Sequence, residues 1–274
     1  STRKESSAAS DVYKRQNLYT MKILLTNDDG VHAQGIRELA ETLAQIATVT
    51  VVAPTEPRSG ASSQITSRTP LRLSLMEESA QLPYQLYSCS GTPVDCVKLA
   101  LNTLFASELP DLVVSGINHG RNDGICAIYS GTVGAAIEAA IARIPAVAFS
   151  LADHSDKCNF SEVCAFAKHF IPQVAEHGLP HTTMLNVNFP KAPAKGIKWA
   201  PQGTGRFVNE YMRAETPHGT PVYWMQGDQV DPDQRTGTDH YWLLEGYASI
   251  SPLQIDMTDH PFLEQVTQQW SLHL

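Results

Sequence analysis

Short apolar segments alternate with helix-like segments along this chain, and this alternation constrains its fold more than any other feature. Five segments read as buried strands: 22–26, 49–54, 111–118, 145–150 and 183–190. Four segments between them carry apolar residues at helical spacing: 34–47, 91–105, 130–144 and 161–178. Strands that are apolar throughout and separated by helices form parallel sheets covered on both faces. The chain is therefore predicted to be an α/β protein with a mostly parallel sheet and helices on both faces.

Two of the helical segments carry local signals. Segment 91–105 starts clearly, because Thr92 can cap it, Pro93 suits its first turn and Asp95 lies three residues after the cap. Segment 161–178 contains Pro172, which predicts a kink or an early end.

The pattern changes after about residue 195. Segments 219–227 and 240–256 read as extended β segments, and 260–270 reads as a closing amphipathic helix. We expect a catalytic core over 21–195 and an extension over 196–274 that packs on the main sheet or reaches another subunit. Residues 1–20 are polar and aperiodic and lack the apolar run of a secretory signal, so we expect an extraneous or disordered leader.

Composition excludes several classes of partner. The formal net charge is -8 and there is no basic run, which argues against free nucleic acid. The sequence has no stretch of about eighteen apolar residues that could span a membrane. The 5 cysteines have no CxxC spacing, so reduced thiols of a cytoplasmic protein are expected rather than a disulfide framework or a zinc site.

Two adjacent carboxylates, Asp28 and Asp29, follow the first predicted strand. In open parallel sheets ligands bind outside the carboxyl ends of the strands, which is where these residues are expected. One interpretation is a turn, because Asp-Gly pairs are common turn formers. The other is a cation site, because a hard divalent cation such as Mg²⁺, Mn²⁺ or Ca²⁺ favours oxygen ligands and removes the repulsion between the carboxylates.

Two further strand ends carry oxygen-bearing side chains. Ser59 lies in the loop after the second strand, where it could be a surface residue, a neutral metal ligand or a phosphate donor. Asn118 follows the third strand; it could satisfy its own backbone, offer a carbonyl oxygen to a metal or donate to a phosphate. His119 beside it is interpreted as a solvated loop residue.

A helix start supplies a candidate anion site. Ser130, Gly131 and Thr132 open the segment 130–144, where free N–H groups and the positive end of the helix dipole favour a phosphate. An ordinary helix cap is the alternative. A metal site facing an anion site would suit phosphoryl chemistry, in which the metal polarises the phosphoryl oxygens and activates a water.

The motifs resemble those of the SurE family. They are "MKILLTNDDGVHAQGI", "VVAPTEPRSGAS", "GTPVDCV", "VVSGIN" and "IYSGTVGAA", in this order, and the resemblance extends from Met21 to the end of the chain. It implies a Rossmann-like core, a C-terminal β-rich extension and terminal helix that exchange between subunits, and a homodimer or homotetramer. The implied activity is metal-dependent hydrolysis of nucleoside 5′- and 3′-monophosphates, and in some relatives of short polyphosphate.

The resemblance also implies roles for single residues. One divalent cation (Mg²⁺, Mn²⁺ or Ca²⁺) would be held by Asp28, Asp29, Ser59 and Asn118, and phosphate would be bound by Asn118, Ser130, Gly131 and Thr132. Asp28 and Asn118 are the expected catalytic residues. The loop "HGRNDGIC" (119–126) departs from the family pattern, so Arg121 and Asp123 could alter substrate preference.

Two other classes of protein fit the sequence less well. A signalling receiver domain needs a phosphoacceptor Asp at the end of the third strand and a Lys near the fifth, but the third strand ends "SGIN" and the segment "PAVAFS" has no Lys. A dinucleotide-binding oxidoreductase needs G-x-G-x-x-G after the first strand, and "NDDGVHAQG" has the wrong spacing.

Overall fold

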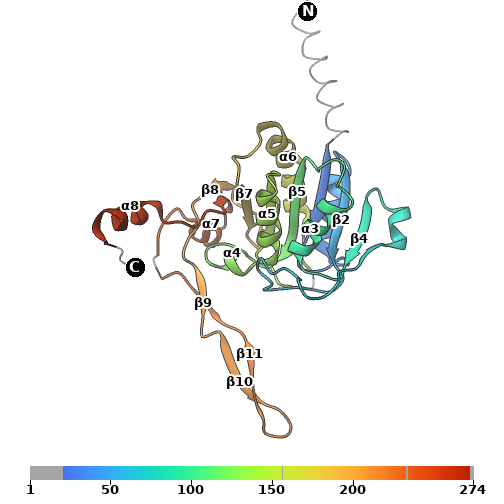
Figure 1. Cartoon of the computed structure of the whole chain (residues 1–274). Helices are drawn as coiled ribbons and strands as arrows, with labels where there is room; N and C mark the ends of the chain where they lie inside the picture. The colour runs from blue at the N-terminus through green and yellow to red at the C-terminus, as the bar shows by residue number, and fades with distance from the viewer. Residues whose placement is uncertain (1–20, 156, 233, 272–274) are drawn as a thin grey trace, which may run out of the picture.

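A nine-stranded sheet forms the centre of the computed structural model, which describes residues 21–155, 157–232 and 234–271 (Figure 1). The strand order is β3-β4-β2-β1-β5-β6-β7-β13-β8. The predicted leader, 1–20, lies outside the described residues.

The five predicted strands are all present, close to their expected bounds. They are β1 (Lys22–Thr26), β2 (Thr48–Pro54), β5 (Leu112–His119), β6 (Ala146–Leu151) and β7 (Thr183–Phe189). Each pairs in parallel with its neighbours among these five. The prediction of a mostly parallel sheet is thereby confirmed, and the carboxyl ends of these strands meet at one edge.

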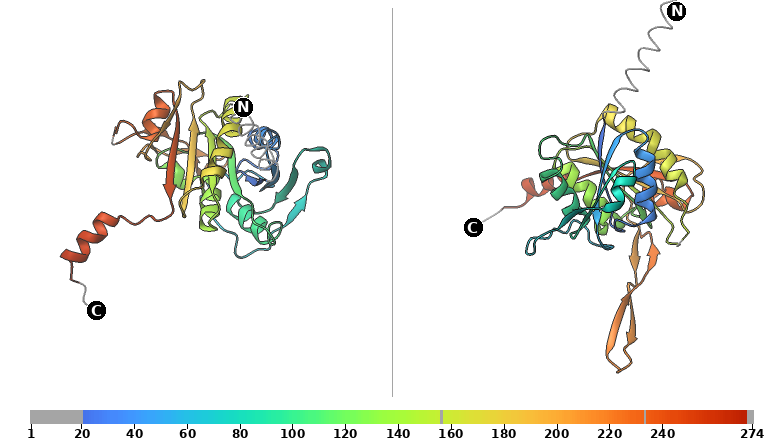
Figure 2. Two further views of the ribbon diagram at one scale, coloured as in Figure 1. Left: turned by 90° about the horizontal axis from the view of Figure 1, so that it is seen from above. Right: turned by 90° about the vertical axis from the view of Figure 1, so that its right-hand side faces the viewer.

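Helices cover both faces of the sheet, as predicted. Helices α2 (Gln34–Leu43) and α6 (Ser161–His177) lie on one face, and α3 (Pro93–Asn102) and α5 (Gly131–Ile141) lie on the other (Figure 2). Strand β1 shows why both layers are needed: Ile23 and Leu25 belong to the first hydrophobic cluster, whereas Leu24 between them belongs to the second. Successive side chains of a strand point to opposite faces, so an uninterrupted apolar strand needs a layer on each side.

Helix boundaries follow the capping signals where these exist. Thr92 and Asp95 form a capping box at the start of α3, with Pro93 in the first turn, as predicted. Helix α6 runs through Pro172 to His177, so the early end that we considered does not occur. Helix α2 ends at Leu43, before the expected residue 47, although Ile46 still packs against the core from the following turn.

The sheet extends beyond the predicted strands at both edges. β3 (Leu73–Leu75) and β4 (Gln85–Cys89), with the 3-10 turn η1 (Glu77–Gln81) between them, add to the β2 side. On the other side, β13 (Ala248–Gln254) pairs antiparallel with β7, and β8 (Ile197–Trp199) pairs parallel with β13. The C-terminal region therefore contributes two strands to the main sheet.

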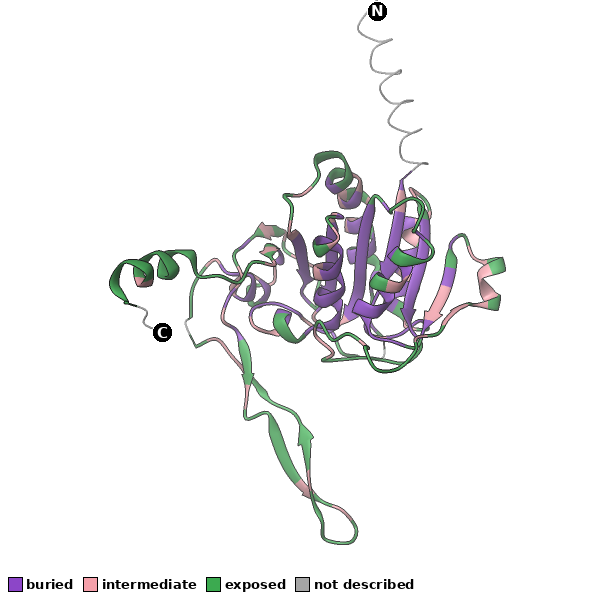
Figure 3. Cartoon of the chain, in the orientation of Figure 1, coloured by how far each residue is buried: buried purple, intermediate pink, exposed green. Residues whose placement is uncertain are grey.

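A long β ribbon projects from the body between β8 and β13. β9 (Arg206–Val208) pairs with β12 (Asp228–Val230), and β10 (Tyr211–Glu215) pairs with β11 (Pro221–Met225), both antiparallel. We call residues 206–230 the arm. It stands clear of the body and is exposed over most of its length (Figures 1 and 3).

The expectation of an extended segment over 240–256 is half wrong. Residues 239–244 form the helix α7 (Asp239–Leu244), and only 248–254 form a strand. The hydroxyl of Thr238 accepts the N–H of Tyr241 and caps α7, and this local cap outweighs the strand-like aromatic run that follows.

Two helices remain. α4 (Cys126–Tyr129) is a single turn before α5, and α8 (His260–Gln269) closes the chain near the predicted bounds with no buried residue (Figure 3). Within the described residues, no helix is both long and apolar enough to cross a membrane.

Candidate active site

The paired acids lie in a tight turn at the carboxyl end of β1. The side chain of Asn27 donates to the Gly30 carbonyl (3.0 Å) and accepts the Gly30 N–H (3.2 Å), and Gly30 adopts a positive φ of 99°. The turn interpretation of this segment is therefore correct for Asn27 and Gly30. The carboxylates of Asp28 and Asp29 take no part in the hydrogen bonds that form this turn.

Asp28 is buried and is contacted from three sides. Thr132, in the first turn of α5, donates its hydroxyl to the Asp28 carboxylate. Arg58, in the loop after β2, donates its backbone N–H to the Asp28 carbonyl (2.7 Å). Gly131 approaches so closely that a Cβ there would lie 2.9 Å from the Cβ of Asp28. The loop after β2 and the start of α5 therefore meet at this aspartate.

Asp29 and Asn118 are joined to the same cluster through the end of β5. The carboxylate of Asp29 accepts the backbone N–H of His119 (3.1 Å). Asn118 donates its amide to the Gly120 carbonyl (2.9 Å), and its Oδ1 lies 3.4 Å from the Thr132 hydroxyl. The side-chain oxygen of Asn118 thus faces the cluster, while its nitrogen is occupied by the backbone.

Both carboxyl groups have raised pKa values. Burial raises the pKa of Asp28 to about 6, and the neighbouring charge of Asp29 adds to the rise. Burial also raises the pKa of Asp29 to about 6, against the hydrogen bond from the His119 N–H. Two ionised carboxylates in this turn are unfavourable on their own, and a perturbed pair of this kind marks a candidate functional site that a bound cation would relieve.

Ser59 lies in the exposed loop that leaves β2. This loop is held on both sides of Ser59. Arg58 bonds to Asp28 as described, and Ser62 donates its hydroxyl to the Ile128 carbonyl (2.7 Å) and its N–H to the Tyr129 carbonyl (3.1 Å). The loop therefore contacts the cluster through Arg58, whereas the side chain of Ser59 is exposed.

The predicted anion site is a capped helix N-terminus. The Ser130 hydroxyl accepts the N–H of Val133 (3.2 Å). Because the hydroxyl acts as the acceptor in this bond, its own hydrogen remains available for donation. The first N–H groups of a helix have no partner inside the helix and point outward along its axis. Because Thr132 bonds to Asp28, this N-terminus lies directly beside the paired acids.

The donor set suits a hard divalent cation. No three His, Cys, Asp or Glu side chains gather into a metal-binding group anywhere in the described part of the chain. A cation at Asp28 and Asp29 could draw on neutral oxygens, namely Asn118 Oδ1, which faces the cluster, and the Ser59 hydroxyl, whose loop reaches the cluster at Arg58. Oxygen ligands are those that Mg²⁺, Mn²⁺ and Ca²⁺ prefer.

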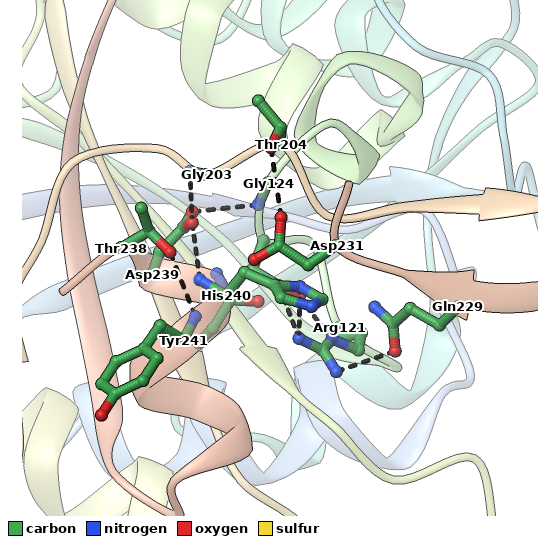
Figure 4. A network of polar contacts seen from close by, with 12 residues as sticks. Arg121, Gly124, Gly203, Thr204, Gln229, Asp231, Thr238, Asp239, His240 and Tyr241 are labelled. Atoms are coloured by element: carbon green, nitrogen blue, oxygen red, sulfur yellow. Dashed lines mark hydrogen bonds and ion pairs between the residues drawn. The ribbon is translucent and has the colours of Figure 1, made fainter. Parts of the chain in front are cut away.

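Sequence reasoning missed the buried network that holds the loop after β5 (Figure 4). Arg121 makes a bidentate pair with the fully buried Asp123 (2.5 Å for each bond) and donates to Gln229 Oε1 in β12 (2.8 Å). His240 Nδ1 lies 2.8 Å from the Asp123 carboxylate. Gln229 and His240 lie more than 100 positions from this loop in sequence, and the one available signal was the unusual loop 119–126.

A second anchor fixes the same loop to the sheet. Asn122 donates its N–H to Asn188 (2.8 Å) and its amide to Ser150 (2.9 Å), and its carbonyl accepts the amide of Asn186 (2.8 Å). The loop that follows Asn118 is therefore held by β6 and β7 as well as by the arm.

Comparison with known proteins gives one consistent family. A sequence model described as "Survival protein SurE" matches residues 23–209. A "5'-nucleotidase SurE" of Porphyromonas gingivalis is 49% identical over 243 residues, covering 89% of this chain and 94% of the relative. A protein of the same name from Flavobacterium psychrophilum is 44% identical and covers 92% of this chain and 98% of the relative.

A solved structure agrees with the sequence matches. The crystal structure of the SurE protein from Aquifex aeolicus superposes with a TM-score of 0.77 at 34% identity, covering 90% of this chain and 99% of the other.

Proposed function

The chain belongs to the SurE family, and on that premise we propose that it is a divalent-metal-dependent 5′-nucleotidase. It would hydrolyse nucleoside 5′-monophosphates to nucleoside and phosphate. The observation that carries the proposal is the convergence of two carboxylates with raised pKa, Asp28 and Asp29, on the N-terminus of α5 through the Thr132–Asp28 hydrogen bond.

Each member of the cluster has a proposed role. Asp28, Asp29, Ser59 and Asn118 would hold the cation, which when bound polarises the phosphoryl oxygens and activates a water. The Ser130–Thr132 turn would bind the phosphoryl oxygens with backbone N–H groups and the Ser130 hydroxyl, assisted by Asn118. Asp28 would orient the attacking water or accept its proton, and Thr132 would hold the Asp28 carboxylate in place.

The substrate range follows from the kind of site. A helix N-terminus recognises a terminal phosphoryl group and not its position on a sugar. The proposal therefore includes nucleoside 3′-monophosphates and short polyphosphate as further substrates.

The assembly is proposed to be a homodimer or homotetramer that exchanges its C-terminal elements. The outer strands of the arm, β10 and β11, expose large apolar side chains, namely Tyr211, Met212, Tyr223, Trp224 and Met225, and α8 exposes Phe262, Leu263 and, just past its end, Trp270. Exposed apolar groups of this extent are typical of protein interfaces. All five cysteines are free, which suits the reducing cytoplasm that we propose as its location.

Phosphate release tests the catalytic proposal. The wild-type protein is assayed with nucleoside 5′- and 3′-monophosphates and with short polyphosphate, in Mn²⁺, Mg²⁺, Ca²⁺ or EDTA. We expect release that requires a metal and is abolished in Asp28→Asn. Glu176→Gln, which removes an exposed carboxylate on α6, is the matched control and should be unaffected.

A second variant separates turnover from folding. Asn118→Ala should lower kcat while the circular dichroism spectrum stays that of the wild type. Release that persists in EDTA, or that Asp28→Asn retains, would overturn the metal-dependent mechanism.

A further inference from the structure

A pocket of about 350 Å³ lies between α4 and the base of the arm. One wall comes from the residues just before α5, and the other from β9 and the residues after it. Its lining includes Ile125, Cys126, Tyr129, Arg206, Phe207 and Glu210. Pockets of this size accept small organic ligands.

The pocket begins one residue from the proposed phosphate site. Tyr129, in its wall, is followed directly by Ser130, the N-cap of α5. The Tyr129 carbonyl also accepts the N–H of Ser62, so the loop that carries Ser59 contacts the same residue. One wall of the pocket is therefore continuous in the chain with the start of α5, where we place the phosphate, and is in contact with the loop that carries Ser59.

The lining suits a flat heteroaromatic ring. Tyr129 and Phe207 are 65% and 40% exposed, so their aromatic faces are available. Burial raises the pKa of the Cys126 thiol to about 11, which keeps that part of the wall neutral beside the apolar Ile125. Arg206 and Glu210 add a hydrogen-bond donor and an acceptor at the rim. Aromatic faces with a few polar groups are how proteins hold bases.

The two walls are fixed to each other. The Ile125 N–H donates to the Gly205 carbonyl (2.9 Å), immediately before β9. Phe207 lies opposite Gln229 in the β9–β12 ladder, and Gln229 accepts from Arg121 in the loop after β5. The position of Phe207 is therefore set by the same loop that follows Asn118.

We propose that this pocket binds the base of the nucleoside monophosphate, with Phe207 as the residue that stacks on it. The inference rests on the proposed function, because the phosphate is placed at α5. It assigns substrate selectivity to the base of the arm, a segment that contributes nothing to the proposed metal and phosphate sites.

The test compares a substrate that has a base with one that lacks it. The kcat/KM ratio of adenosine 5′-monophosphate to ribose 5-phosphate is measured for the wild type, Phe207→Ala and Phe207→Leu. Leucine keeps an apolar side chain at this position but has no ring face, so the leucine variant tests stacking even if the alanine variant folds poorly. We expect the ratio to fall about tenfold in both variants, mainly through KM for the nucleotide. Trp199→Ala, which removes an exposed aromatic on the edge strand β8, is the control and should keep the wild-type ratio.

The outcomes separate this inference from the proposed function. An unchanged ratio in both Phe207 variants, or equal losses on the two substrates, would overturn the base pocket while leaving the phosphatase intact. Release from neither substrate by the wild type would overturn the proposed function, and the pocket would then be judged by adenosine binding in EDTA, followed by saturation-transfer NMR. Adenosine signals that weaken in Phe207→Leu would support the pocket, and no signal with the wild type would overturn it.

Discussion

Thr132 donates its side-chain hydroxyl to the carboxylate of Asp28, and this bond connects the first turn of α5 to the end of β1. Through it, the N-terminus of a helix and the carboxyl end of a strand are held together. Two elements more than 100 residues apart in sequence thus form one site.

Removing this hydroxyl should weaken metal binding. Thr132→Val keeps the shape of the buried side chain but leaves the Asp28 carboxylate without its donor, so the pKa of Asp28 should rise further. We expect the affinity for Mn²⁺, measured by calorimetry, to fall about 10–100-fold, in line with the loss of other groups that orient a ligand. Thr132→Ser restores the hydroxyl and should recover most of the affinity. Wild-type Mn²⁺ affinity in the valine variant would contradict this role.

The metal-free protein should lose stability as the pH rises from about 4 to about 7. The pKa of Asp28 is about 6 in the folded state against an ordinary value of 3.8, so the folded chain keeps a proton that the unfolded chain has released. Each pKa unit corresponds to about 1.4 kcal/mol, so a rise of this size at Asp28, to which the neighbouring Asp29 contributes, corresponds to a loss of about 3 kcal/mol. Denaturant unfolding in EDTA at a series of pH values measures this.

Asp28→Asn provides the comparison for that pH series. The asparagine side chain cannot ionise, so the stability of this variant should fall less than that of the wild type over the same pH range. The melting temperature of the variant should also not rise when Mn²⁺ is added at pH 7.5. Identical pH profiles for the variant and the wild type would show that the Asp28 charge is not the destabilising group.

Gly134→Ala should impair the site through the loop that carries Ser59. A Cβ at Gly134 would lie 2.4 Å from the carbonyl oxygen of Ser62, so the loop must move away from α5. Replacing glycine by alanine inside a helix normally stabilises it by about 1 kcal/mol, which makes a loss of activity the more telling result. We expect a lower kcat, measured by phosphate release. Ile141→Ala, at an exposed position of the same helix, is the control and should retain wild-type turnover.

Arg121→Met should loosen the base of the arm. Asp123 is fully buried, and hydrogen bonds from His240 and Arg121 hold its pKa below the ordinary value although burial alone would raise it. Removing one partner of a buried ion pair typically costs about 3–5 kcal/mol. Hydrogen exchange followed by mass spectrometry should show faster exchange in β9 and β12.

The control for Arg121 lies within the arm. Arg213 pairs with Glu215 at 3.5 Å on the exposed surface, and Arg213→Met should change stability by less than about 1 kcal/mol. Slow exchange in β9 and β12 of the Arg121 variant would mean that the arm is held by other contacts.

The features that the sequence predicted correctly are encoded locally. The strand that contains Leu24 has three consecutive apolar residues at its centre, and the capping residues Thr92 and Ser130 are followed at once by the helices they begin. Asp28, Asp29 and Asn118 could be placed at one edge because parallel strands end there, and the helix start at Ser130–Thr132 was expected to face them. Their mutual contacts in the structure follow from this rule, whereas their roles as ligands and catalysts stay predictions.

The features that the sequence did not reveal depend on distant partners. α7 reads as a strand until the Thr238 cap is considered, and β13 could not be assigned to the edge of β7 because nothing local specifies an antiparallel partner. The Arg121–Asp123–His240 network joins a loop to a helix 117 positions away, and neither segment predicts the other.

The path of the chain around β13 has a practical consequence. The chain leaves the sheet after β8, forms the arm and α7, and returns as β13 to lie between β7 and β8. The arm thus leaves from, and returns to, strands of one sheet, and its tip near 216–220 projects away from that sheet (Figure 1). That tip is a natural point of attachment: a fluorophore or an affinity tag inserted there would report on the assembly and leave β1 and β5, at whose ends Asp28 and Asn118 lie, untouched.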